Sequence, residues 1–131
     1  MVNTVPHRPR VPAGWHAVTP RIVVTDVRRF IEFLIHVFGA TGKCEPTRPS
    51  VVWIGDSPVM VSDVGFRPPT SAFLYVYVED AGATYQRAIQ AGVRVLEQPS
   101  DMPYGDRRCM FEDQWGNTWQ VATYRGLPSA D

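Results

Sequence analysis

The sequence predicts an α+β fold in which two βαβββ modules form a curved, cup-like mixed sheet with the helices outside. The main observation is an internal repeat. Aligning residues 24–26 with 78–80 superimposes two segments of helical periodicity, and it also matches the turn residues 55–56 with 116–117. A second observation is that each module alone would leave one sheet face uncovered, so the two copies need each other. A cup between them is a natural ligand site.

The first module begins with residues 18–24, which alternate and are rich in β-branched side chains, as in a strand. Asp26 is a good helix N-cap, and Gly39 follows the last residue of the helical period. Residues 51–54 and 59–62 are two further predicted strands, joined by a turn at 55–56. The helix places its apolar side chains on one face: Val27, Phe30, Ile31, Leu34, Val37 and Phe38.

The second module repeats this order with a strand at residues 73–78. Asp80 caps the second helix, which ends at Gly92. A short strand at 93–96 and a hairpin of 107–112 with 118–124 across the turn at 115–117 complete it. The inward side chains of this helix are predicted to be Ala81, Tyr85, Ala88 and Ile89.

The domain organisation follows from the repeat and from the two ends of the chain. Residues 1–14 are predicted to be an extended Pro-rich tail, because prolines recur at every third position from Pro6 to Pro12. Residues 15–125 form one domain, with module 1 at about 15–66 and module 2 at about 70–125. Residues 126–131 are predicted to be a loose tail.

The composition narrows the class of partner. The 131 residues include 13 basic and 13 acidic side chains, a balance that argues against a nucleic-acid partner and against capture on an anionic membrane. The longest apolar run, residues 72–78, is far too short for a membrane span. The two cysteines lie far apart and form no CxxC motif, which favours a reducing compartment and a cytoplasmic location.

Short motifs in both modules resemble those of a known family. They are Gly14-Trp15-His16, Val18-Thr19-Pro20, Asp26, Ile31-Glu32-Phe33, Phe38-Gly39-Ala40, Gly55-Asp56-Ser57, Met60-Val61-Ser62-Asp63, Tyr77-Val78-Glu79-Asp80, Ala91-Gly92, Gly105-Asp106-Arg107 and Asp113-Gln114-Trp115-Gly116-Asn117. Their order over residues 12–125 resembles the PhnB-like branch of the vicinal oxygen chelate superfamily. That superfamily includes glyoxalases, extradiol dioxygenases, fosfomycin-modifying enzymes and bleomycin-sequestering proteins. By analogy, the resemblance also implies a homodimer.

The resemblance implies where metal ligands would lie in metal-dependent members. These positions, usually His or Glu, fall here on Thr19, Phe73, Gln120 and either Val59 or Met60. Such side chains do not make a divalent-metal site, so we expect no metal and no cofactor. The histidines do not supply one either, since His7 lies in the tail, His36 on the first helix and His16 before the first strand. A rearranged set with Glu79, Glu112 or His16 is the alternative.

Strand alternation predicts which side chains line the cup. The predicted lining is aromatic with a few polar groups, and Arg107 is added as a possible anion ligand. The ligand-binding candidates are Thr19, Arg21, Trp53, Met60, Phe73, Tyr75, Tyr77, Arg107 and Gln120. Arg107 has a structural role in the hairpin as its alternative. Tyr75 and Tyr77 either meet the ligand or pack in the core or a dimer.

Arg21 is the most informative of these residues. An arginine inside a partly dry cup needs a carboxylate or phosphate partner, which an acidic ligand would supply. The alternatives are an internal ion pair with Glu112 or Glu45, or an arginine that reaches solvent. Cys109 has no histidine nearby in the sequence and is predicted to be an inert buried thiol.

Four functions compete at this point. The first is a metal-free small-molecule binding protein that holds an aromatic or planar apolar ligand in the cup. The second is a cofactor-independent isomerase, cyclase or lyase, in which Arg21 stabilises an anion and Tyr75, another tyrosine or His16 moves a proton. The third is a metal-dependent glyoxalase-like lyase or dioxygenase with rearranged ligands. The fourth is a structural or regulatory dimer with a filled cup. Whether the chain is an enzyme is left open.

Overall fold

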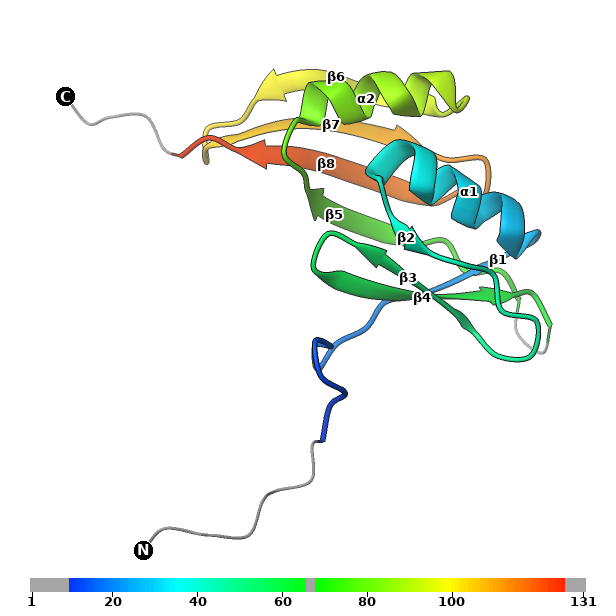
Figure 1. The fold of residues 1–131 in the computed structure, drawn as a ribbon. Helices are drawn as coiled ribbons and strands as arrows, with labels where there is room; N and C mark the ends of the chain where they lie inside the picture. Colours follow the sequence, from blue (N-terminus) through cyan, green and yellow to red (C-terminus); the bar gives the residue numbers. More distant parts are fainter. Residues whose placement is uncertain (1–9, 66–67, 127–131) are drawn as a thin grey trace, which may run out of the picture.

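The computed structural model describes residues 10–65 and 68–126 and contains two modules of the same topology (Figure 1). The predicted fold class is confirmed: each module has a four-stranded mixed sheet and one helix. The first sheet has the order β1-β4-β3-β2 and the second the order β5-β8-β7-β6. In each, the first strand of the module pairs in parallel with the last one.

The first module consists of four strands and one helix. The strands are β1 (Arg21–Val24), β2 (Thr41–Gly42), β3 (Ser50–Ile54) and β4 (Ser57–Asp63), and helix α1 spans Val27–Phe38. Strand β1 is shorter than the predicted 18–24, and Val18 is 82% exposed. Strand β2 was not predicted from the sequence, because two residues are too few to show a period of two.

The second module has the same composition of elements. Its strands are β5 (Phe73–Tyr77), β6 (Arg94–Asp101), β7 (Asp106–Glu112) and β8 (Thr118–Tyr124), and helix α2 spans Ala81–Gln90. Strand β6 is longer than the predicted 93–96. It is the edge strand, and its register to β7 shifts twice, so Pro99 can lie within it without interrupting a central ladder.

Both helices begin and end as their sequences indicate. The side chains of Asp26 and Asp80 each accept a hydrogen bond from the backbone N–H three residues further on. Gly39 has a φ of 66°, and Gly92, just after the second helix, has a φ of 87°, a region that glycine enters without steric cost. The predicted inward face of α2 needs one correction. Thr84 is buried and Ile89 is 42% exposed, because the helix lies slightly rotated from the predicted orientation.

The two modules share one hydrophobic core between their helix-bearing faces. The ring of Phe38, at the end of α1, lies 4.8 Å from Trp119 on β8 and 6.5 Å from Phe111 on β7, measured between centroids. Trp115 packs edge-on against Phe30 at 5.0 Å, and its indole N–H donates to the carbonyl oxygen of Thr25. The opposite face of each sheet is covered by no helix of the described residues, and we call these the helix-free faces.

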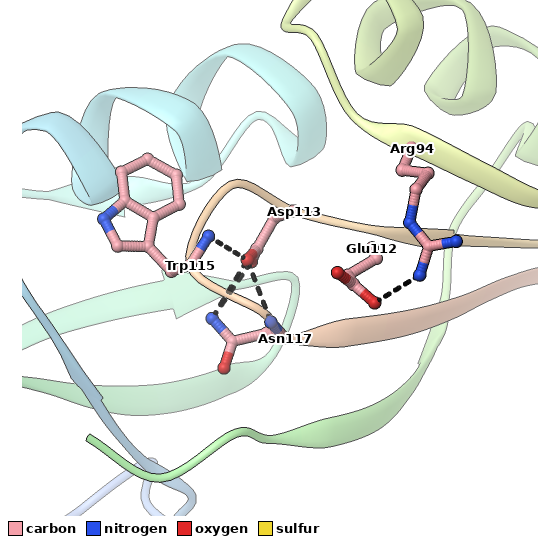
Figure 2. Close-up of polar contacts among 5 residues, drawn as sticks. All are labelled: Arg94, Glu112, Asp113, Trp115 and Asn117. Carbon is pink, nitrogen blue, oxygen red and sulfur yellow. Dashed lines mark hydrogen bonds and ion pairs between the residues drawn. The ribbon is translucent and has the colours of Figure 1, made fainter. Parts of the chain in front are cut away.

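The turn between β7 and β8 is held by one buried carboxylate (Figure 2). Asp113 Oδ1 accepts from the backbone N–H groups of Trp115 and Asn117, and its Oδ2 accepts from the Asn117 side-chain amide. Oδ2 also accepts from the Trp119 indole N–H. Trp119 is fully buried, and Trp115 packs against the same core. Because Asp113 is 4% exposed, this network fixes the turn that carries both tryptophans into the core.

Among the described residues, no helix is both long enough and apolar enough to cross a membrane.

Candidate functional site

The helix-free face of the second sheet carries three aromatic residues in a row along β5. Their exposed fractions are 66% for Phe73, 39% for Tyr75 and 61% for Tyr77. The register places Phe73 beside Thr118, Tyr75 beside Gln120 and Tyr77 beside Ala122. These positions agree with the predicted alternation, which directed the same side chains away from the helix.

A buried carboxylate lies on the same face, two strands away on β7. Asp106 is 2% exposed, and its Oδ2 accepts hydrogen bonds from the hydroxyl groups of both Tyr75 and Tyr77, the latter at 2.9 Å. Between them, β8 presents Ala122, which is fully buried. A small side chain at this position leaves room for the two tyrosine rings to reach Asp106 across the sheet.

These contacts keep the tyrosines neutral. Burial and the hydrogen bond to Asp106 raise the pKa of Tyr75, and the hydrogen bond to Asp106 is the main cause that raises the pKa of Tyr77. A phenolate beside a carboxylate would add a second negative charge, which explains the direction. The sequence named Tyr75 and Tyr77 but missed Asp106 as their partner, because the contact joins residues about thirty positions apart.

Arg108 continues the polar cluster beyond Asp106. Its guanidinium donates to Glu97 at 2.7 Å and to the Tyr104 hydroxyl at 2.9 Å. The side chain of Arg108 is 17% exposed, so the ion pair with Glu97 is partly shielded from solvent. Burial alone would lower the pKa of Arg108, but the bond to Glu97 outweighs it and the pKa is raised.

Tyr75 and Tyr77 also border a cavity between the two modules. The cavity measures about 490 Å³, and its wall includes His16 and strand β5. Its apolar lining comes from Val18, Pro20, Ile54, Pro58, Val59, Leu74, Val76 and Trp119. His16 Nε2 lies 3.2 Å from the carbonyl oxygen of Asp56, at the turn between β3 and β4. The size suits a small planar molecule.

The predicted residues of the first module lie elsewhere. Arg21 is exposed, donates from Nε to Ser62 Oγ at 2.8 Å, and borders a cavity of about 570 Å³. Trp53 and Met60 border another, of about 580 Å³. The proposed ion pair of Arg21 with Glu112 or Glu45 is not formed, because Glu112 pairs with Arg94 and Glu45 with Arg48.

Other candidates are also placed by the fold. Thr19 and Gln120 are partly buried, Thr19 just before β1 and Gln120 on β8. Arg107 points to the helix-bearing side of the second sheet, where it bonds to Asp101 at 3.2 Å. It therefore lies on the opposite face from Tyr75, which separates it from the other predicted ligand-binding residues. Cys109 is fully buried, and burial raises the pKa of its thiol to about 11.

The residues at the implied metal positions do not fit a divalent metal. The parallel register pairs Arg21 with Met60, which resolves the uncertain fourth position to Met60 rather than the buried, helix-facing Val59. The set is then Thr19, Met60, Phe73 and Gln120, with no imidazole, carboxylate or thiolate. Within residues 10–65 and 68–126, no three His, Cys, Asp or Glu side chains gather in a way that could hold a metal ion.

Known proteins resemble this chain along most of its length. A protein of Mycobacterium bovis described as uncharacterized is 26% identical over 123 residues, covering 80% of this chain and 81% of that protein. TioX from Micromonospora sp. ML1 superimposes with a TM-score of 0.66 at 21% identity, covering 82% of this chain and 99% of that one. The fosfomycin resistance protein FosX of Mesorhizobium loti gives a TM-score of 0.63 at 20% identity, covering 82% and 91%.

At these sequence identities, the similarity to the solved structures shows only that the fold is shared. The family is shown by a sequence model that matches residues 15–121. The chain therefore belongs to the glyoxalase/bleomycin resistance protein/dioxygenase superfamily.

Proposed function

We propose that the chain is a metal-free small-molecule binding protein that holds an aromatic or planar apolar ligand against the aromatic row of β5. The observation that carries the proposal is the exposure of Phe73, Tyr75 and Tyr77 side by side on one helix-free face. Large apolar side chains gathered at a surface mark interaction sites more often than chance exposure. The neighbouring cavity of about 490 Å³ adds a concave, mostly apolar wall.

A ligand titration tests this proposal. We expect an aromatic metabolite or antibiotic with a planar ring system to raise the melting temperature of the protein, since a ligand that binds only the folded state stabilises it. Phe73→Ser should weaken this shift. Ile89→Ser is the matched control, because Ile89 is also exposed but lies on α2, away from the helix-free face. Binding that is equal in both variants would contradict the proposal.

We further propose that the protein acts as a homodimer in which the helix-free face of the first sheet meets that of the second sheet in the partner. Within one chain, Arg21 borders one cavity, Trp53 and Met60 another, and the tyrosines a third. A swapped pair of modules would unite these residues in one cup. The two free cysteines are in keeping with a reducing, cytoplasmic setting.

Mixed dimers test this arrangement. Arg21→Ala and Phe73→Ser would each damage both cups of a homodimer. Mixing the two variants should restore one intact cup in each mixed dimer. Because half of the dimers are mixed when equal amounts exchange freely, the mixture should regain a quarter of the binding capacity. A monomer in sedimentation velocity, or no recovery on mixing, would count against the swapped dimer.

A cofactor-independent isomerase, cyclase or lyase is the second candidate. One observation favours it: His16 and Tyr75 border the same cavity, so a base and a hydrogen-bonding group could meet one substrate there. The raised pKa of Tyr75 keeps its hydroxyl protonated, which leaves His16 as the candidate base. Turnover that is unchanged in both Arg21→Ala and His16→Gln would contradict this function.

The third candidate is a metal enzyme with rearranged ligands, and elemental analysis of the purified protein tests it. We expect less than stoichiometric Zn, Ni, Mn or Fe, because the donor set at the implied positions lacks metal-binding groups.

A further inference from the structure

The hydrogen bonds of the Tyr75 and Tyr77 hydroxyl groups have a fixed direction. Each hydroxyl has one proton to donate, and both donate it to Asp106 Oδ2. The lone pairs of the two phenolic oxygens are then free to accept hydrogen bonds from a ligand. Because the residues Tyr75 and Tyr77 are 39% and 61% exposed, a molecule on the helix-free face can approach these oxygens.

The charges on the same face also favour a ligand group that donates hydrogen bonds. Arg108 is paired with Glu97, and Arg94 with Glu112, so these four charges compensate one another. Asp106 has no cationic partner among the described residues, and its buried Oδ1 has no hydrogen-bond donor there. Arg108 Nε is also buried without an acceptor in that part of the chain, but its guanidinium charge is held by Glu97. Within one chain, the uncompensated charge beneath the aromatic row is therefore negative.

We propose that the site selects planar ligands whose polar group donates hydrogen bonds, an amine foremost, and that Asp106 is the positioning residue that sets this preference. The inference rests on the proposed ligand-binding function and names its ligand class. An ammonium group near Tyr75 and Tyr77 would meet two acceptor oxygens, an anionic carboxylate behind them and the faces of aromatic rings, which attract cations. A carboxylate ligand would find lone pairs and negative charge at the same place.

Three probes with one ring system separate these contributions. Tryptamine carries an ammonium group, indole-3-propionate a carboxylate on a chain of similar length, and 3-methylindole has neither. We expect tryptamine to bind about tenfold more tightly than 3-methylindole, as for one charge-assisted hydrogen bond, and indole-3-propionate to bind more weakly than 3-methylindole. Isothermal calorimetry or protein-observed NMR measures all three affinities with the full chain.

Two variants and one control assign the preference to named atoms. Tyr75→Phe/Tyr77→Phe keeps both rings and should reduce tryptamine binding to the level of 3-methylindole. Asp106→Asn offers an amide that can donate to one tyrosine oxygen and so reverse that hydroxyl, which should narrow the gap between tryptamine and indole-3-propionate. Tyr124→Phe is the control, because it removes a hydroxyl from an equally exposed tyrosine that pairs with Asp106 in register but donates no hydrogen bond to it.

The outcomes separate the two proposals. If 3-methylindole binds and tryptamine shows no advantage, or if indole-3-propionate binds best, the donor preference is wrong while the ligand-binding function stands. If Tyr124→Phe loses the preference as fully as the double variant, the assignment to Asp106 and its tyrosines is wrong. If none of the three probes binds at millimolar concentration, the aromatic site itself is contradicted. Should the double variant fail to fold, Asp106→Asn alone decides the assignment.

Discussion

Single residues show how strongly the interior controls ionisation. Cys109 lies on β7, fully buried under the shared core, while Cys44 is partly exposed. Burial disfavours the thiolate and raises the pKa of Cys109 from 9.0 to about 11. A thiol-reactive reagent attacks the thiolate form of cysteine, so it reacts only where the thiolate can form. We therefore expect one of the two thiols, Cys44, to react in the folded protein at about pH 8, and both to react in denaturant.

The same pKa shift predicts a loss of stability in alkali. Because the pKa is higher in the folded state, the unfolded thiol ionises first, and the free energy of unfolding decreases as the pH rises from about 9 towards 11. Between pH 8 and pH 10 the decrease should be about 1 kcal/mol. Urea denaturation at both pH values measures it. Cys109→Ala should remove most of the difference, and an unchanged difference in that variant would assign the effect to other groups.

The two helices have the same kind of N-cap but different backbone conformations at the cap residue. Both helices have an aspartate N-cap, but Asp26 has a φ of 61°, whereas Asp80 is extended with a φ of −139°. Alanine at either position loses the cap, which costs about 1 kcal/mol. At position 26 it would also have to adopt the left-handed region, at about 1 kcal/mol more.

Asp26→Ala should therefore destabilise the protein by about twice as much as Asp80→Ala. Chemical denaturation of the two variants measures the difference. Asp26→Asn is the control, since asparagine both caps helices and tolerates a positive φ. Equal losses from the two alanine variants would show that the backbone at position 26 relaxes.

The turn between β7 and β8 allows a second comparison at this scale (Figure 2). Asp113→Ala would leave the Trp119 indole and the Asn117 amide without their buried acceptor, at a cost of about 3 kcal/mol. Glu112→Ala, one residue earlier, breaks an exposed ion pair with Arg94 and should cost less than about 1 kcal/mol. Thermal melts of both variants check the ranking, which similar losses would contradict.

At the scale of the whole molecule, the modules depend on one another. Phe38 on α1 packs on Trp119 of β8, and Trp115 packs on Phe30, so each module completes the core of the other. We expect one cooperative unfolding transition for the whole domain. That residues 15–125 form a single domain stays a prediction, and the number of transitions in chemical denaturation tests it.

Hydrogen exchange measures the coupling directly. Phe38→Ala should lower the protection of amides in both α1 and α2, by about 2 kcal/mol or more, because it opens a cavity shared by the modules. Ile35→Ala is the control, since Ile35 lies on the same helix but is 43% exposed. Loss of protection confined to α1 would mean that the modules unfold separately.

The sequence predicted those features that depend on neighbouring residues. Helix α1, its cap and its final glycine were predicted because their signals repeat within a few positions. Strand β2 and the extent of β6 were missed because short and irregular edge strands carry little periodicity. The row of Phe73, Tyr75 and Tyr77 followed from alternation, but alternation could not say that Arg107 would point to the other face of its sheet, because that depends on the register to β8.

By itself, the sequence determined the family, the repeat and the aromatic character of the exposed strand, since these are encoded in local patterns and in the order of motifs. Only the tertiary structure brought Asp106 beneath Tyr75 and Tyr77, placed Arg21 beside Ser62, and joined the two modules through their helix-bearing faces. These contacts join residues some thirty to ninety positions apart. They depend on strand register and side-chain packing, which are set when both sheets close on one core.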